Sequence, residues 1–343
     1  MAEDKKLSEL DMFIAQKVFP DARAIFLART ASVDQIKDDC QVVIDTNALL
    51  VPYTVSRESL EQIGQTYSKL AAQKRLVVPG QVAREFARNR AYKLAELYQQ
   101  LSRKRNVRQF QEGSYPLLAS LPEYQGVVRA ERQLDKLVKD YQALIDKLLD
   151  HVQSWAWDDP VSLLYAQVFT EDVVVDPPID EAELRSDLQR RQIHKLPPGY
   201  KDSSKADSGI GDLLIWHTIL CLGKTHHRSV IFVSGDEKPD WWYQSENQAL
   251  YPRYELVDEF RRSSGGQSFH IIKFSDLLRL YGATVKTVQE VRQEEIQVRA
   301  EPGLPASPPV QEARARGDTR WSRLSPNGSV AGTPARGYRE GGT

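Results

Sequence analysis

Two short apolar runs of the chain are each followed closely by an aspartate, and carboxylates in such places can bind metal ions. Residues 42–44 precede Asp45, and residues 230–233 are followed by Ser234, Gly235 and Asp236. Apolar runs that are rich in β-branched residues and closed by turn residues are typical of buried parallel strands. Ligands of open α/β sheets bind outside the carboxyl ends of the strands, so both aspartates are expected at the chemically active edge.

Two further acids lie between these runs. Glu85 falls in an expected helix, and Asp212 follows Gly211 at the expected start of another. Four acids on separate elements, without a matching cluster of His or Cys, favour an oxygen-only site for Mg²⁺ or Mn²⁺. Such an ion lowers the pKa of a bound water, which could then attack a phosphodiester. The pattern is therefore that of a metal-dependent nuclease.

Each acid also has an ordinary structural interpretation. Asp45 and Asp212 are good helix caps, and Glu85 taken alone would be a solvated helix residue. Thr46 and Asn47 favour the functional interpretation of Asp45, because both side chains can orient its carboxylate. The joint pattern, rather than any single acid, predicts the site.

The composition limits the classes of function. The chain has 343 residues, is 41% hydrophobic and carries a formal net charge of −1, so contact with nucleic acid must come from local basic patches. The two cysteines, Cys40 and Cys221, lack metal-site spacing and are expected to be free thiols in a reducing cytosol. Neither a signal-peptide pattern nor an apolar run that could span a bilayer is found, so a cytoplasmic protein is expected.

The elements that position the acids alternate between strands and helices, which predicts a three-layer α/β domain with a central, mainly parallel sheet. A helical lead-in (1–39) precedes this domain (40–285), and a Pro- and Gly-rich tail (299–343) is predicted to be disordered. A charged segment at about 91–155 predicts two long helices that form an antiparallel insertion. The other expected elements are helices at 56–76, 181–191, 212–222 and 275–281, and strands at 75–79 and 269–274.

The acids together with their neighbours resemble the PIN-like domain nucleases, and more closely the bacterial PIN-like proteins with a long helical insertion. The blocks that carry the resemblance are residues 43–50, 78–90, 198–202, 211–216 and 233–242. The resemblance implies that Asp45, Glu85, Asp212 and Asp236 hold Mg²⁺ or Mn²⁺ and are the catalytic acids. It implies Asp240 as an extra ligand, or as an outer-shell acid that holds a metal-bound water.

The resemblance also implies supporting and substrate-binding residues. Asn47 and Asp202 would orient the ligands, and Lys205 would contact substrate from the loop before Asp212. RNA is implied more strongly than DNA as the bound nucleic acid, and a homodimer or an activating protein partner is left open. No membrane partner is expected.

Basic side chains outside the acidic site are the expected phosphate contacts, because such contacts give sequence-independent affinity. The alternative is a solvated helix face paired with its own acids. Trp241 and Trp242 could stack bases, although core packing is the expectation for at least one of them. The basic residues expected to make these contacts from the helix of Glu85 are Arg84, Arg88, Arg90, Lys104 and Arg105.

Two other functions are compatible with parts of this pattern. A haloacid-dehalogenase-like phosphatase needs a second aspartate two positions after the first, and that position is Asn47. A catalytically silent PIN-like scaffold that binds nucleic acid or a protein is the alternative that keeps the fold. The presence of all four acids argues against that scaffold.

Overall fold

The computed structural model describes residues 11–107, 115–201, 209–246 and 248–300. Its helices are α2 (Ile14–Val18), α3 (Ala24–Leu27), α4 (Val33–Ile36), α5 (Thr46–Leu50), η1 (Val51–Tyr53), α6 (Arg57–Ala72), α7 (Gly80–Arg105), η2 (Pro116–Leu118), α8 (Pro122–Ser154), α9 (Pro160–Val168), α10 (Glu181–His194), α11 (Ile210–His226), α12 (Tyr254–Ser263), α13 (Phe274–Leu280) and α14 (Val285–Ala300). Its strands are β1 (Gln41–Ile44), β2 (Leu76–Pro79), β3 (Val174–Val175), β4 (Val230–Val233), β5 (Trp242–Ser245), β6 (Gln248–Pro252) and β7 (Phe269–Ile272).

A five-stranded parallel sheet in the order β3-β2-β1-β4-β7 lies at the centre of this fold. Every residue of β1 and β4 is buried, as expected for strands that are covered on both faces. Residue Ile44 of β1 lies opposite Val233 of β4, so the residues after these strands emerge together at the carboxyl edge. The predicted α/β fold with a parallel sheet is confirmed.

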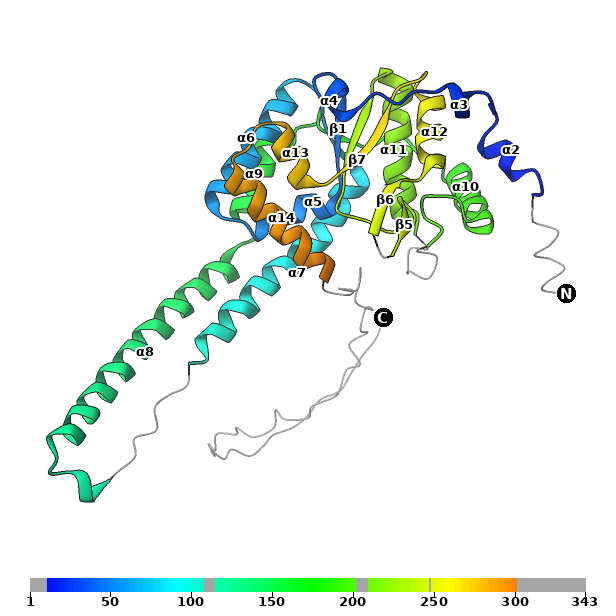
Figure 1. Ribbon diagram of the computed structural model, residues 1–343. Coiled ribbons are helices and arrows are strands. Elements are labelled where there is room, and N and C mark those ends of the chain that lie inside the picture. The colour runs from blue at the N-terminus through cyan, green and yellow to red at the C-terminus, as the bar shows by residue number, and fades with distance from the viewer. Residues whose placement is uncertain (1–10, 108–114, 202–208, 247, 301–343) are drawn as a thin grey trace, which may run out of the picture. The chain divides into compact units, whose positions relative to one another are not determined.

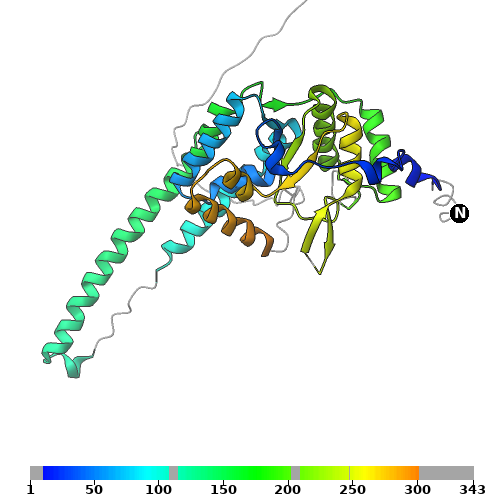
Figure 2. The ribbon, with the colours of Figure 1, turned by 45° about the horizontal axis from the view of Figure 1, so that its top comes forward.

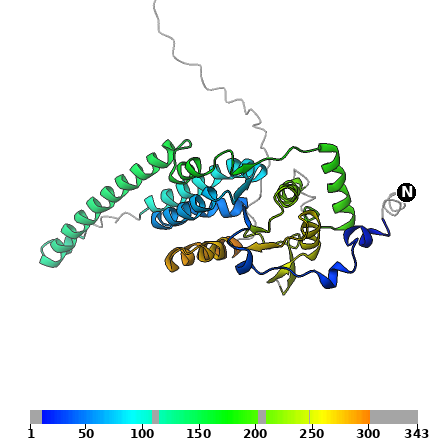
Figure 3. The same cartoon turned by 90° about the horizontal axis from the view of Figure 1, so that it is seen from above.

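Helices cover both faces of the sheet (Figures 1 and 3). On one side α6, α9 and α13 meet through stacked or tilted rings of Tyr67, Tyr165 and Phe274. On the other side Trp216 of α11 packs edge-on against Phe269 of β7. The two aromatic clusters supply much of the buried apolar area that holds the three layers together.

The long helical insertion is confirmed as an antiparallel pair of α7 and α8 (Figures 1 and 2). Gln153 near the end of α8 donates a hydrogen bond to Tyr98 of α7 at 3.0 Å. Arg105, the last residue of α7, forms an ion pair with Asp146 at 2.5 Å. Residues 108–114, part of the segment that joins the two helices, lie outside the described residues.

The structure contains elements that the sequence analysis did not predict: α9, the edge strand β3, the β5–β6 hairpin, α12 and α14. Helix α14 extends the packed unit beyond the predicted end at 285, with Val291 fully buried. Its Glu290 accepts hydrogen bonds from the hydroxyls of Ser56 and Ser59 at 2.8 and 2.7 Å. The predicted tail from 299 falls on the end of α14 and then, from 301, outside the described residues, as do residues 1–10 of the lead-in.

None of the described helices combines the length and the apolar character that crossing a bilayer requires.

Candidate functional site

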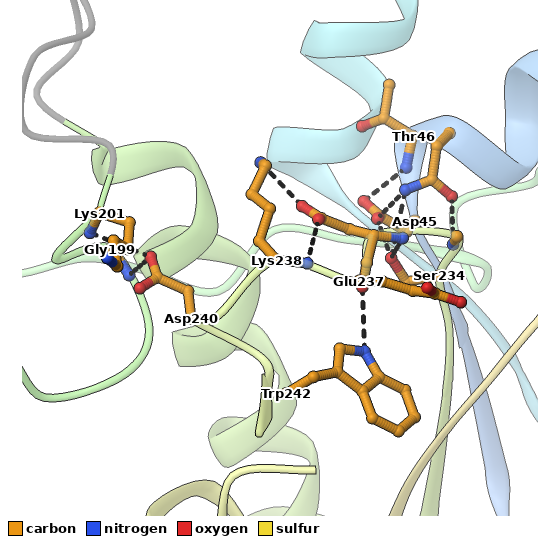
Figure 4. Close-up of polar contacts among 12 residues, drawn as sticks. Asp45, Thr46, Gly199, Lys201, Ser234, Glu237, Lys238, Asp240 and Trp242 are labelled. Carbon is orange, nitrogen blue, oxygen red and sulfur yellow. Dashed lines mark hydrogen bonds and ion pairs between the residues drawn. The ribbon is translucent and has the colours of Figure 1, made fainter. Parts of the chain in front are cut away.

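Asp45 lies at the carboxyl end of β1 and caps the N-terminus of α5. Its Oδ1 accepts a hydrogen bond from the backbone N–H of Thr46 at 2.7 Å. Its Oδ2 accepts two more, from the hydroxyl of Ser234 and from Nδ2 of Asn47, each at 2.6 Å (Figure 4). These donors fix the orientation of a carboxylate that is only 8% exposed.

The β1–β4 register explains why Ser234 reaches Asp45. The backbone N–H of Asp45 donates to the carbonyl of Val233 at 3.0 Å, which continues the ladder past the end of both strands. Ser234 then follows directly, and its hydroxyl also accepts from the N–H of Asp236 at 3.0 Å. Ser234 therefore connects the two strand-end aspartates, a role that the sequence analysis missed. The signal was its equivalence to Asp45 in the strand register.

Glu85 is linked to Asp45 through a shared neighbour. The hydroxyl of Thr46 donates to Glu85 Oε2 at 2.6 Å, and Gln81 donates to Oε1 at 2.9 Å. Thr46 is on α5 and Glu85 on α7, and these two helices pack against each other. The acid from the long helix is thereby linked through Thr46 to the acid from the sheet.

The electrostatics of Asp45 reflect this grouping. Burial raises the pKa of Asp45 from 3.8 to about 6, the hydrogen bond from Ser234 opposes that rise, and the charges of Asp236 and Glu85 add to it. A carboxylate whose ionised form is opposed by burial and by like charges is one that a cation would stabilise. Asp45, Glu85 and Asp236 thus form one acidic neighbourhood.

Asp236 is partly neutralised by its own loop. The ammonium of Lys238 lies 2.7 Å from Asp236 Oδ2, and the backbone N–H of Lys238 donates to Oδ1 at 2.9 Å. The indole N–H of Trp242 donates to the carbonyl of Asp236 at 3.0 Å (Figure 4). Lys238 was not predicted as a site residue, because a lysine two positions from an acid has no sequence signature of its own.

Asp212 is in the first turn of α11, and it is half-buried. Helix α11 packs against α7, the helix that carries Glu85. An acid in a first turn is stabilised by the helix dipole whether or not it has a further role. The metal-binding role of Asp212 stays a prediction.

The donor set fits a hard divalent cation, since carboxylate oxygens are the ligands that Mg²⁺ and Mn²⁺ prefer. Each oxygen of Asp45 and Glu85 that accepts only one hydrogen bond has a lone pair left for another contact. In residues 11–107, 115–201, 209–246 and 248–300, no group of three or more His, Cys, Asp or Glu is close enough to hold a metal ion. The residue types therefore fit the cation, while the described side chains do not form a closed set of ligands.

Asp240 does not lie beside Asp45. It is fully buried, and its Oδ2 accepts from the backbone N–H groups of Gly199 and Lys201 at 3.0 and 3.3 Å. Figure 4 shows its carboxylate turned toward that loop and away from Asp45. The predicted fifth ligand is instead a loop anchor. The predicted roles of Asp202 and Lys205, which come next along this loop, lie outside the described residues.

Arg90 also differs from its prediction as an exposed phosphate contact. It is 6% exposed, and its guanidinium forms an ion pair with Asp159 at 2.6 Å and donates a hydrogen bond to the hydroxyl of Ser162 at 2.9 Å. The ring of Trp157 lies 4.5 Å from the guanidinium carbon. Arg90 is on the buried face of α7, so its charge is used inside the fold.

The other predicted phosphate contacts on α7 lie on its exposed face. Arg88 and Lys104 are exposed. Arg84 and Arg105 are also exposed, and each forms an ion pair, with Asp176 and Asp146 respectively. The predicted phosphate contacts at these positions remain predictions.

The two adjacent tryptophans have different roles. Trp241 is 2% exposed and packs on Phe232 and Trp216, which confirms that at least one of the pair belongs to the core. Trp242 is half-buried, and its indole is held by Asp236.

Comparison with known proteins gives one match. The family model described as a PIN-like domain matches residues 41–256, well over half of the chain. This range begins at β1 and includes Asp45, Glu85, Asp212 and Asp236. No curated protein and no solved structure matches the chain. From this match and the parallel sheet that carries the acids, we conclude that the chain belongs to the PIN-like domain family.

Proposed function

We propose that this protein is a Mg²⁺- or Mn²⁺-dependent nuclease that hydrolyses phosphodiester bonds of RNA or single-stranded DNA. The observation that supports the proposal is the buried carboxylate of Asp45, whose pKa is raised by burial and by the neighbouring charges of Asp236 and Glu85. Like charges at short range are unfavourable without a cation. Membership of the PIN-like family supports the same chemistry by analogy.

The side chains that would hold the ion are Asp45, Glu85, Asp212 and Asp236. A bound Mg²⁺ or Mn²⁺ would supply Lewis-acid activation of water and stabilise charge on the phosphate. The chain's own contribution is orientation: Ser234 and Asn47 restrain Asp45 Oδ2. Thr46 restrains Asp45 through its N–H and Glu85 through its hydroxyl.

The substrate would be held by the exposed cations of α7. Arg88 and Lys104 are exposed on the helix that carries Glu85. A nucleic-acid strand whose phosphates contact them would therefore extend along this helix toward the acids. Such contacts are not specific for sequence and weaken with salt. RNA is proposed ahead of single-stranded DNA on the family resemblance.

The proposal is tested with labelled single-stranded RNA and DNA, incubated with Mg²⁺, with Mn²⁺ or with EDTA. Cleavage should require the metal and should fall to background in an Asp45→Asn/Asp236→Asn double mutant, because two of the proposed ligands lose their charge. Asp34→Asn is the matched control, since Asp34 is 83% exposed and belongs to α4, outside the site. Nucleic-acid binding without cleavage under every condition would reject the nuclease and favour the silent scaffold.

Lys238 gives a separate prediction on metal affinity. Its ammonium neutralises Asp236, so a divalent ion must compete with it for the same carboxylate. Lys238→Met should therefore bind Mn²⁺ more tightly, by about tenfold if the competition is worth about 1.4 kcal/mol. Isothermal titration calorimetry measures this affinity. Lys286→Met is the control, because Lys286 pairs with Glu58; an equal affinity in all three proteins would contradict the prediction.

A further inference from the structure

Helix α8 carries a row of exposed apolar side chains at a regular spacing. The row, here called the exposed stripe, consists of Val127, Ala130, Leu134, Leu137, Tyr141, Leu144 and Leu148. Its members alternate at intervals of three and four residues, over three heptads. Its six large side chains are between 39% and 64% exposed. A soluble protein rarely leaves so continuous an apolar row without a partner.

The exposed stripe is distinct from the side of α8 that packs on α7. That side is formed by Ile145, Leu149 and Val152, all of which are buried. Helix α7 ends at Arg105, which contacts Asp146, so most of the exposed stripe lies beyond the end of α7. The apolar side chains of the stripe are therefore not needed for the contact between α7 and α8.

The spacing indicates the kind of partner. A three-four alternation has a period of 3.5 residues, which keeps an apolar seam facing another helix as the two supercoil. In the sequence of residues 301–343, the large apolar residues, which include Leu304, Trp321 and Leu324, do not recur at this spacing. The stripe itself does follow it, so a second copy of α8 is a matching partner.

We propose that two copies of this chain associate through antiparallel pairing of the Leu137–Leu148 part of their exposed stripes, in which Leu137 faces Leu148 of the partner subunit. One of the two alternating core positions of the stripe includes Tyr141 and Leu148, and the residues just before these are Asp140 and Lys147. In an antiparallel coiled coil, residues at this preceding position face the same position of the other helix. With Tyr141 layered against Leu144 of the partner subunit, Asp140 faces Lys147 of the partner subunit, and symmetry repeats the pair. Sliding one helix by a heptad would instead oppose the two copies of Asp140.

A parallel arrangement lacks this complementarity. It would place Asp140 beside Ile145 of the partner subunit and Lys147 beside Val152 of the partner subunit. Ile145 and Val152 are the residues that each copy buries against its own α7. Charge pairing thus selects the antiparallel register, in which an isologous two-fold contact closes on itself and yields a dimer.

The test uses the full chain and measures its mass in solution by sedimentation equilibrium. The wild type should have twice the chain mass of 39.0 kDa. Leu137→Glu/Leu144→Glu should dissociate it, with the dimer Kd raised by about 100-fold or more, since core apolar side chains dominate such interfaces. Both leucines are at least 60% exposed, so the far-ultraviolet circular dichroism spectrum should still be that of the folded protein.

Leu117→Glu is the matched control, because Leu117 is 95% exposed and is outside the exposed stripe. It should leave the dimer intact. A monomeric wild type at high micromolar concentration would overturn the proposal. So would a double variant that stays dimeric.

The register has its own test. Asp140→Lys alone and Lys147→Asp alone should each weaken self-association, because each creates two like-charge contacts. Their equimolar mixture should form a heterodimer at least about tenfold tighter than either homodimer, since both charge contacts are then restored. A mixture no tighter than its components would overturn the antiparallel register. None of these measurements depends on nuclease activity.

Discussion

Replacing Arg90 with methionine should lower the free energy of unfolding by about 3–5 kcal/mol, the usual cost of removing one partner from a buried ion pair. The side chains of Arg90 and Asp159 are 8% and 1% exposed. Methionine preserves most of the volume of the arginine but provides no donor for the carboxylate. The loss therefore comes from the charge that remains on Asp159.

Asp159 cannot turn toward water to escape this cost, because it also caps α9. Its Oδ1 accepts hydrogen bonds from the backbone N–H groups of Val161 and Ser162 at 3.1 and 3.0 Å. Burial raises the pKa of Asp159, but hydrogen bonds from Ser162 and Arg90 outweigh it and hold the pKa below its usual value. Without Arg90, the protein must either bury an unpaired carboxylate or protonate it.

Urea denaturation of the wild type and the variant measures the change. Arg88→Met is the matched control, since Arg88 is on the same helix, two residues away, and exposed; its effect should stay within about 0.5 kcal/mol. If both variants lost the same small amount of stability, the buried ion pair would not have the role that its geometry indicates. The same comparison separates Arg90 from the exposed arginines that are proposed to bind phosphate.

Replacing Asp45 with asparagine should make the metal-free protein more stable at neutral pH, although it removes a proposed ligand. The pKa of Asp45 is raised from 3.8 to about 6, so between these values the folded state holds a proton that the unfolded chain releases. Unfolding free energy then falls as pH rises through this window, by up to about 3 kcal/mol. Above pH 6 the full cost of the buried charge is present in the wild type.

Asparagine at this position carries no charge and removes this pH dependence. Its amide has one acceptor oxygen where the carboxylate has two, so the hydrogen bonds from Thr46, Ser234 and Asn47 cannot all be kept. This loss offsets part of the gain, so a net stabilisation of about 1–2 kcal/mol is expected. Denaturation in EDTA at pH 4.5 and 7.5 should show the difference growing with pH. Asp34→Asn should show no such trend. A variant that is less stable than the wild type at pH 7.5 would contradict the prediction.

Addition of Mg²⁺ or Mn²⁺ should make the wild type more stable than Asp45→Asn, the reverse of the order expected in EDTA. A ligand that binds only the folded state stabilises it in proportion to the logarithm of its concentration over Kd. The wild type should gain stability in this way, whereas Asp45→Asn should gain much less. Stability in EDTA tests the buried charge, and the response to metal tests the site, so the two inferences can fail separately.

Local sequence patterns were sufficient to predict the sheet and the positions of Asp45 and Asp236 at its edge. Both follow from local information: runs of β-branched residues form buried parallel strands, and turn residues end them. The pairing of α7 with α8 also follows from local information, since the spacing of apolar residues within each helix indicates its apolar face. The exposed stripe is visible in that periodicity as well.

The contacts between side chains from distant elements could not be predicted in this way, because they depend on how the elements pack. The sequence does not distinguish Arg90 from the other basic residues of its charged helix, because its partner Asp159 is 69 positions away along the chain. Asp240 is close to Asp236 in the sequence, yet its carboxylate accepts a hydrogen bond from the backbone N–H of Gly199. Ser234 becomes part of the site only through the strand register. A periodic pattern indicates which face of an element is buried. It does not indicate which oppositely charged residue a buried charge will pair with, because packing brings the two together from distant parts of the chain.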